Sequence, residues 1–207
     1  MHNNPLIYTD PTGHYTFKND PSKPAVVQGY VVSADMHASD KLVEFLKTYE
    51  TFSGQWYYAT KDEKERNIKT IGYGHVIQPG QENLLKGVTE EQALSLLKSD
   101  IQNKAENYIN DWADRNGIVF TQQQFDALVS WKFNGGDFLN RDPGKMLKVG
   151  YFSSSEFQNE FKNEMLLWVK GSGKKLPGLY LRRYDEWEMF VNGDYTRNYN
   201  RVIPSGF

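Results

Sequence analysis

Four segments of the chain carry apolar residues at three- to four-residue intervals, the spacing that gathers them on one face of an α-helix. The first segment begins at Ser39 or Asp40, either of which can cap a helix, and runs to about Tyr49. Two others open at Thr89 and Thr121, each followed three residues later by a glutamine, which is the pattern of a capping box. The predicted helices are residues 40–49, 90–112, 122–134 and 157–169.

Between the first two helices, the sequence favours strands. Residues 56–60 are rich in tryptophan, tyrosine and threonine, which are common in strands. Residues 61–67 are charged and predict a turn, and residues 68–73 predict the return strand of a hairpin. The two glycines that close this region, Gly72 and Gly74, indicate a turn or a close approach of the backbone to another group.

Residues 1–38 differ from the remainder of the chain. Prolines at positions 5, 11, 21 and 24 exclude a long helix here. Residues 26–32 have the composition of a short strand or hairpin arm. We therefore divide the chain into a leading segment, residues 1–38, and a domain, residues 39–207.

The composition is that of a soluble globular protein, and it excludes several classes of function. Hydrophobic residues make up 39% of the 207 residues and charged residues 24%. The net charge of −2 does not favour nucleic acid as a partner, and no apolar run is long enough to span a bilayer. The chain has no cysteine and its four histidines lack metal-ligand spacing, so we expect neither a metal nor a cofactor. We expect a monomer, and the N-terminus lacks the basic and apolar regions of a signal peptide.

The candidate chemistry lies at the end of the first helix and in the return strand. Glu50 follows the helix on its apolar side, and the return strand carries Thr70 and, beyond the two glycines, His75. A carboxyl group beside apolar side chains is suited to donating a proton. This arrangement predicts a general acid, Glu50, facing a glycine-rich hairpin.

These residues resemble the phage-type lysozymes, in which a helix ends in a catalytic Glu and a hairpin strand carries T-I-G-Y-G-H. That motif is present letter for letter at residues 70–75, and further blocks of the family pattern follow in order at residues 89–100, 122–136 and 178–190. The resemblance implies an α+β lysozyme-like fold, with a small lobe containing the β-hairpin, a larger helical lobe and a cleft between them. It also implies hydrolysis of the β-1,4 bond between N-acetylmuramic acid and N-acetylglucosamine in peptidoglycan.

The resemblance assigns Glu50 to protonation of the leaving glycosidic oxygen, but the second catalytic position departs from the family pattern. Family members carry an Asp shortly after a Tyr on the first strand, where this chain has Thr60. Asp62 shares a face with Thr60 if the strand continues, because side chains alternate along a strand. We favour Asp62 as the second carboxylate, with Thr60 as the alternative, and expect Thr70 to help place the water.

Other residues in these blocks are expected to support the site or contact the substrate. His75 fits a hydrogen-bonding support for the hairpin better than a proton carrier, and Tyr73 lies in the same motif. Asn134 is expected to face the cleft. Arg182 lies four residues before Glu186, which favours a structural salt bridge, although an arginine here could instead pair with the catalytic carboxylate and orient it.

The leading segment contains a second resemblance. Residues 3–13 follow N-N-P-x-x-x-x-D-P-x-G, which resembles the end of the Rhs repeat-associated core, with His14 where that family often has Leu. This resemblance implies that the chain is the C-terminal toxin of an Rhs polymorphic toxin, that Asp10 belongs to the self-cleavage motif and that the toxin begins near Tyr15. The alternative is a linker rich in turn-forming residues.

The two resemblances together imply an antibacterial secreted effector that acts on peptidoglycan in the periplasm or cell wall of a target cell. A cognate immunity protein would then be its partner. The alternatives are a prophage endolysin, a non-catalytic peptidoglycan-binding module and a lytic transglycosylase. The last two are compatible with a missing second carboxylate.

Overall fold

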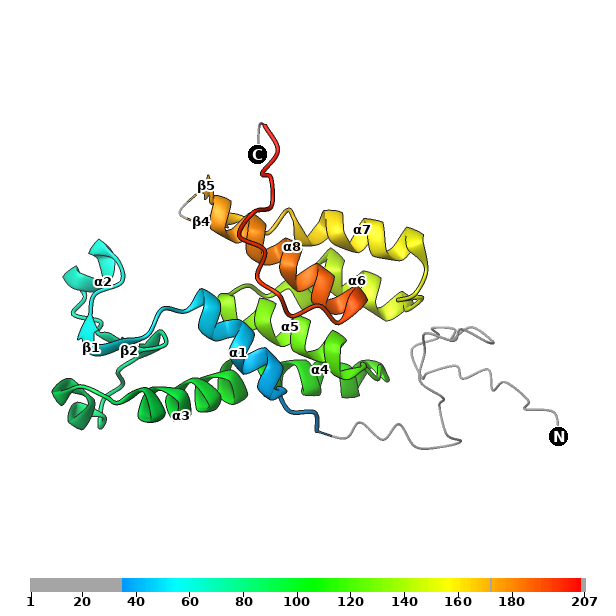
Figure 1. Ribbon diagram of the computed structural model, residues 1–207. Helices are drawn as coiled ribbons and strands as arrows, with labels where there is room; N and C mark the ends of the chain where they lie inside the picture. Colours follow the sequence, from blue (N-terminus) through cyan, green and yellow to red (C-terminus); the bar gives the residue numbers. More distant parts are fainter. Residues whose placement is uncertain (1–34, 172, 206–207) are drawn as a thin grey trace.

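The computed structural model describes residues 35–171 and 173–205 (Figure 1). The smaller part of the fold is an antiparallel sheet with the strand order β1-β2-β3. Figure 1 shows the sheet at one end of the molecule, with α1 and α3 both leading from it into the helical part. The elements of this part are α1 (Asp40–Tyr49), β1 (Ser53–Tyr57), α2 (Lys61–Glu65), β2 (Thr70–Gly72), β3 (His75–Val76) and the 3-10 helix η1 (Glu82–Lys86).

The larger part is helical and includes a short hairpin. Its central helix is α5, along which α8 packs. The elements are α3 (Glu90–Ile101), the π-helical segment η2 (Gln102–Glu106), α4 (Asn107–Asn116), α5 (Gln122–Asn134), the 3-10 helix η3 (Phe138–Asn140), α6 (Asp142–Val149), α7 (Ser155–Met165), β4 (Lys170–Gly171), β5 (Lys174–Lys175) and α8 (Pro177–Asn192). Within the described residues, no helix is long and apolar enough to cross a membrane.

The core surrounds α5, which is buried along most of its length. Trp131 is fully buried and stacks on Phe138 with ring centroids 3.9 Å apart. Leu42 and Leu46 of α1 belong to the same apolar cluster. The helix that carries the candidate catalytic residue is therefore fixed directly to the core of the helical part.

The helix starts predicted at Ser39, Thr89 and Thr121 are confirmed, whereas the helix predicted over residues 157–169 is α7, which begins at Ser155 and ends at Met165. Ser39 is the N-cap of α1, and its side chain accepts a hydrogen bond from the Leu42 N–H. Both capping boxes, at Thr89 and Thr121, are present. Gly135 follows α5 with a φ of 112°, which only glycine adopts without strain, so the helix ends where expected.

The charged run between the strands is not the simple turn that the sequence analysis expected. Residues Lys61–Glu65 form α2, and the Thr60 side chain caps it by accepting a hydrogen bond from the Glu63 N–H. The first strand ends at Tyr57 and does not continue to Asp62. The assumption that placed Thr60 and Asp62 on one face of a strand is therefore wrong, because a threonine cap followed by acidic residues starts a helix.

Other differences are smaller. The predicted helix over residues 90–112 is interrupted by the π-helical segment. The helices predicted from apolar spacing do not include α8, which starts at Pro177, a residue favoured in the first turn of a helix. After Tyr195 the chain still packs on the fold, because Arg197 stacks on the Tyr49 ring at 4.3 Å. The Rhs-like motif and the strand predicted over residues 26–32 lie outside the described residues.

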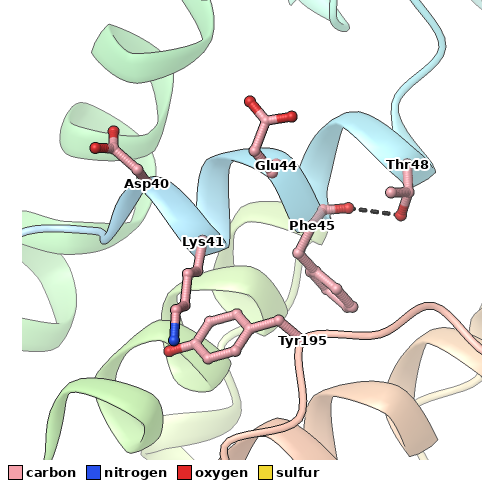
Figure 2. Close-up of a pocket in the computed structure, with 6 residues that line it drawn as sticks. All are labelled: Asp40, Lys41, Glu44, Phe45, Thr48 and Tyr195. Atoms are coloured by element: carbon pink, nitrogen blue, oxygen red, sulfur yellow. Dashed lines mark hydrogen bonds between the residues drawn. The ribbon is translucent and has the colours of Figure 1, made fainter.

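This C-terminal segment borders an open groove of about 430 Å³ beside α1 (Figure 2). Figure 2 shows the Tyr195 ring lying under the helix, between Lys41 and Phe45. The groove is lined by Asp40, Lys41, Glu44, Phe45, Thr48 and Tyr195.

Candidate active site

Glu50 is the C-cap of α1, and its backbone N–H still donates to Leu46 O, at 2.8 Å. The Arg182 Nη1 donates to Glu50 Oε1 at 2.7 Å, and the Glu50 side chain is 24% exposed. A methyl group in place of the Gly74 hydrogen would lie 3.7 Å from Glu50 Oε2. The carboxyl group is therefore held on one side by Arg182 and faces the β2–β3 turn on the other.

A buried charge network holds Arg182 in place. Arg182 Nε donates to Glu186 Oε1 at 3.2 Å, and Ser130 Oγ donates to the same oxygen at 2.7 Å. Arg183 pairs with Glu186 and donates to Asn134 Oδ1 at 2.7 Å. Burial lowers the pKa of Arg183 to about 10, which still leaves it cationic at neutral pH. The sequence left open whether the arginine binds Glu186 or the catalytic carboxylate; Arg182 does both, and Asn134 serves this network.

Thr70 and Tyr57 are partners across the sheet, one on β2 and the other on β1. Thr70 is buried, and its Oγ1 has no hydrogen-bond partner within the described part of the chain. Tyr57 is 37% exposed. Burial, followed by the negative charges of Glu50 and Glu63, raises the pKa of the Tyr57 hydroxyl. The Tyr57 and Thr70 pair therefore places two hydroxyl groups in the part of the sheet where the Glu50 charge contributes to the raised pKa of Tyr57.

His75 and Tyr73 connect the sheet to α3. His75 is buried, with Nδ1 3.0 Å from Asp100 Oδ2 and Nε2 2.9 Å from Gln81 Oε1. The Tyr73 hydroxyl donates to Glu90 Oε1 at 2.7 Å. Because the side chains of His75 and Tyr73 are both hydrogen-bonded to other protein groups, they are suited to supporting the hairpin.

The structure does not bring Asp62 into this group of side chains. Its side chain is 71% exposed and lies 3.2 Å from Arg66 Nη1. Glu63, by contrast, is half-buried, and its Oε2 accepts a hydrogen bond from the Ala59 N–H at 2.8 Å. The sequence analysis placed Glu63 among the solvated charges of a turn and gave Tyr57 no role in the site. The T-x-x-E spacing from Thr60 was the available signal, because such a glutamate turns back toward the start of its helix.

Among the described residues, no group of three or more His, Asp or Glu side chains could hold a metal ion. The chemistry that the site can perform with its own groups is proton transfer from a carboxyl group.

Comparison with known families shows that the similarity extends far beyond the motif at residues 70–75. The family described as phage lysozyme matches residues 47–186, which include Glu50, Thr70 and Arg182. The chain belongs to the phage lysozyme family. The matched region ends within α8, so the C-terminal segment after Gly193 lies outside it.

Individual relatives agree with this assignment. The chain is 32% identical over 169 residues to an endolysin of Bacillus phage B103 and 31% identical over 181 residues to an endolysin of Bacillus phage PZA. The alignments cover 80% and 82% of this chain but only 58% and 60% of the two endolysins. The muramidase domain of SpmX from Asticaccaulis excentricus superposes with a TM-score of 0.58 at 28% identity, covering 75% of this chain and 99% of that domain. The predicted α+β lysozyme-like fold is confirmed.

Proposed function

We propose that this chain is a muramidase that hydrolyses the β-1,4 bond between N-acetylmuramic acid and N-acetylglucosamine in peptidoglycan. The observation that carries the proposal is the Glu50 carboxyl group, fixed by Arg182 and facing the β2–β3 turn. Membership of the phage lysozyme family and the similarity to two endolysins and a muramidase domain support it.

In this proposal the two oxygens of Glu50 have different tasks. Oε1 accepts the hydrogen bond from Arg182 and so stays an acceptor. The proton for the glycosidic oxygen is therefore carried by Oε2, on the side of Gly74. As the bond to C1 breaks, positive charge develops on the sugar ring. The Thr70 hydroxyl, which is buried and has no protein partner in the described structure, is proposed to hold the attacking water.

The test is digestion of purified peptidoglycan by the wild type and by Glu50→Gln, with products identified by mass spectrometry. Removing a general acid lowers the rate by about 10²- to 10⁴-fold, so Glu50→Gln is expected to fold and to lose hydrolysis. Glu44→Gln, an exposed glutamate on the same helix, is the matched control and should retain activity. Full activity of Glu50→Gln would refute the assignment. Anhydro-muramyl products would indicate a lytic transglycosylase, and wall binding without products a non-catalytic module.

The biological setting follows from different evidence. The curated relatives are phage endolysins, which favours an endolysin that lyses its own host. The effector role, with its immunity protein and its action in a rival cell, depends on the motif at residues 3–13 alone. In both settings the substrate lies in the periplasm or cell wall. A neighbouring holin gene would support the endolysin role. A coding sequence for an Rhs shell joined to this chain, with protection by the product of the adjacent gene, would support the effector role.

A further inference from the structure

Hydrolysis of a glycosidic bond with water generally uses two carboxyl groups, one as the acid and one as the base or nucleophile. Glu50 supplies the first, and Asp62 is turned to solvent. We propose that Glu63 is the second catalytic carboxylate and takes the proton from the attacking water. This inference rests on the proposed muramidase function.

The local structure returns the Glu63 carboxylate to the end of β1. Thr60 starts α2, which places Glu63 in the first turn of the helix. The Glu63 side chain then reaches back, and its Oε2 accepts the hydrogen bond from the Ala59 N–H. The other four residues of α2 are exposed, whereas Glu63 is half-buried. Ala59 has no carboxyl group of its own, but the Glu63 carboxylate lies beside its backbone N–H, two positions after Tyr57.

Tyr57 connects this carboxylate with the site. Tyr57 ends β1, two positions before Ala59, whose N–H binds the Glu63 carboxylate. Burial first, and then the negative charges of Glu50 and Glu63, raise the pKa of the Tyr57 hydroxyl. Tyr57 also faces Thr70 across the sheet, and the Thr70 hydroxyl is unpaired within the described residues. The proposed base thus lies just beyond the strand end that pairs with Thr70, and Glu50 faces the turn that follows β2.

The reaction balances with these groups. The water oxygen attacks C1 while the bond from C1 to the glycosidic oxygen breaks, and its electron pair stays on the leaving oxygen. Glu50 gives its proton to that oxygen, and Glu63 accepts a proton from the water. Exchange with solvent then restores both carboxyl groups. Because water attacks directly, the new reducing end has the inverted configuration at C1.

The experiment compares Glu63→Gln with Asp62→Asn, two neighbouring residues of α2 that lose the same charge. Glutamine keeps an oxygen that can accept the Ala59 N–H, so the start of α2 is preserved. On soluble peptidoglycan fragments, we expect Glu63→Gln to lower kcat by about 10²- to 10⁴-fold with little change in KM. The acidic limb of its pH–rate profile should disappear, since that limb reports the base. Asp62→Asn should stay within about twofold of the wild type and keep both limbs, because an exposed carboxylate paired only with Arg66 takes no part in the reaction.

A second variant separates chemistry from folding. In Glu63→Ala, added formate should restore part of the rate, because a small carboxylate can act as the base in the space left by the side chain. A folded Glu63→Ala protein without any response to formate would overturn the base role.

The inference and the proposed function fail in different ways. If the wild type hydrolyses peptidoglycan and Glu63→Gln is equally active with an intact bell-shaped profile, only the Glu63 assignment is overturned. A loss confined to Asp62→Asn would also overturn it and would give the role to Asp62. If the wild type releases no muropeptides, the muramidase function itself fails, and the assignment of Glu63 with it.

Discussion

Replacing Glu186 by glutamine is expected to destabilise the folded protein strongly. The side chains of Glu186, Arg183 and Arg182 are 0%, 1% and 5% exposed. Without the carboxylate charge, Arg182 keeps its contact with the Glu50 carboxylate, whereas Arg183 keeps a hydrogen bond to the neutral Asn134 and its contact with the Trp131 ring, neither of which supplies a full negative charge. Removing one partner of a buried ion pair costs about 3–5 kcal/mol, because a charge then stays buried without compensation.

The effect is measurable in the free energy of unfolding from urea denaturation, followed by tryptophan fluorescence. A loss of about 3–5 kcal/mol corresponds to a fall in Tm of roughly 6–20 °C for a chain of this size. Asp142→Asn is the control, because it also removes one carboxylate charge from an ion pair. That pair, with Lys145 at 2.7 Å, is exposed on α6 and should contribute almost nothing.

The reasoning is refuted if Glu186→Gln unfolds at the same urea concentration as Asp142→Asn. Groups other than Glu186 would then compensate the charges of Arg182 and Arg183, and the network would not be the main support of Arg182. Loss of stability together with a lower kcat at temperatures where the variant is fully folded would link the network to catalysis as well.

Two further predictions concern contacts at the edges of the site. Arg197→Ala should lower kcat several-fold, since the guanidinium stacks on Tyr49, which directly precedes the proposed acid Glu50. Arg141→Ala, at an exposed position before α6, should leave kcat unchanged. The hydrogen bond to Asp100 raises the pKa of His75, so the protonated imidazole stabilises the fold below pH 6.5, and this contribution is lost as pH rises through the raised pKa. His75→Gln should therefore cost more unfolding free energy at pH 5.5 than at pH 8.5, and an equal loss at both values would contradict the proposed ion pair.

Much of the fold is predictable because its signals are local. The capping boxes at Thr89 and Thr121 and the glycine after α5 are decided by residues within one helical turn of each other, and all three are where the sequence places them. The N-cap and the apolar face of α1 also lie within about ten residues of each other, so this helix is predicted from local signals too. Because Glu50 directly follows the last residue of α1, predicting the end of the helix also places Glu50.

The parts that were missed depend on competing or distant signals. Residues 61–65 have no apolar face, so hydrophobic periodicity gave no helix there, although the cap from Thr60 was visible. The contact between Glu50 and Arg182 joins positions 132 residues apart, and no local pattern distinguishes it from the pair with Glu186 four residues on. Sequence could name these partners, whereas only the folded chain shows that one arginine serves both.

The helix that carries Glu50 is too short to be stable alone, since isolated helices below about 12–15 residues are marginal in water. It is held at both ends by buried carboxylates. At its start, the Ser39 hydroxyl donates to Asp126 Oδ2 at 2.5 Å. At its end, the Tyr49 hydroxyl donates to Asp185 Oδ2 at 2.5 Å. The position of Glu50 is thus set by two anchors as well as by Arg182.

Both anchors are shared with the C-terminal segment. The Tyr195 hydroxyl donates to Asp126 at 2.7 Å, and the Asn198 N–H donates to Asp185 at 3.0 Å. This segment lies beyond residues 47–186, the range matched by the phage lysozyme family. Because each carboxylate binds α1 and the segment together, loosening the segment would leave each anchor with one partner fewer. A part of the chain outside the matched range therefore contributes to holding Glu50 in place.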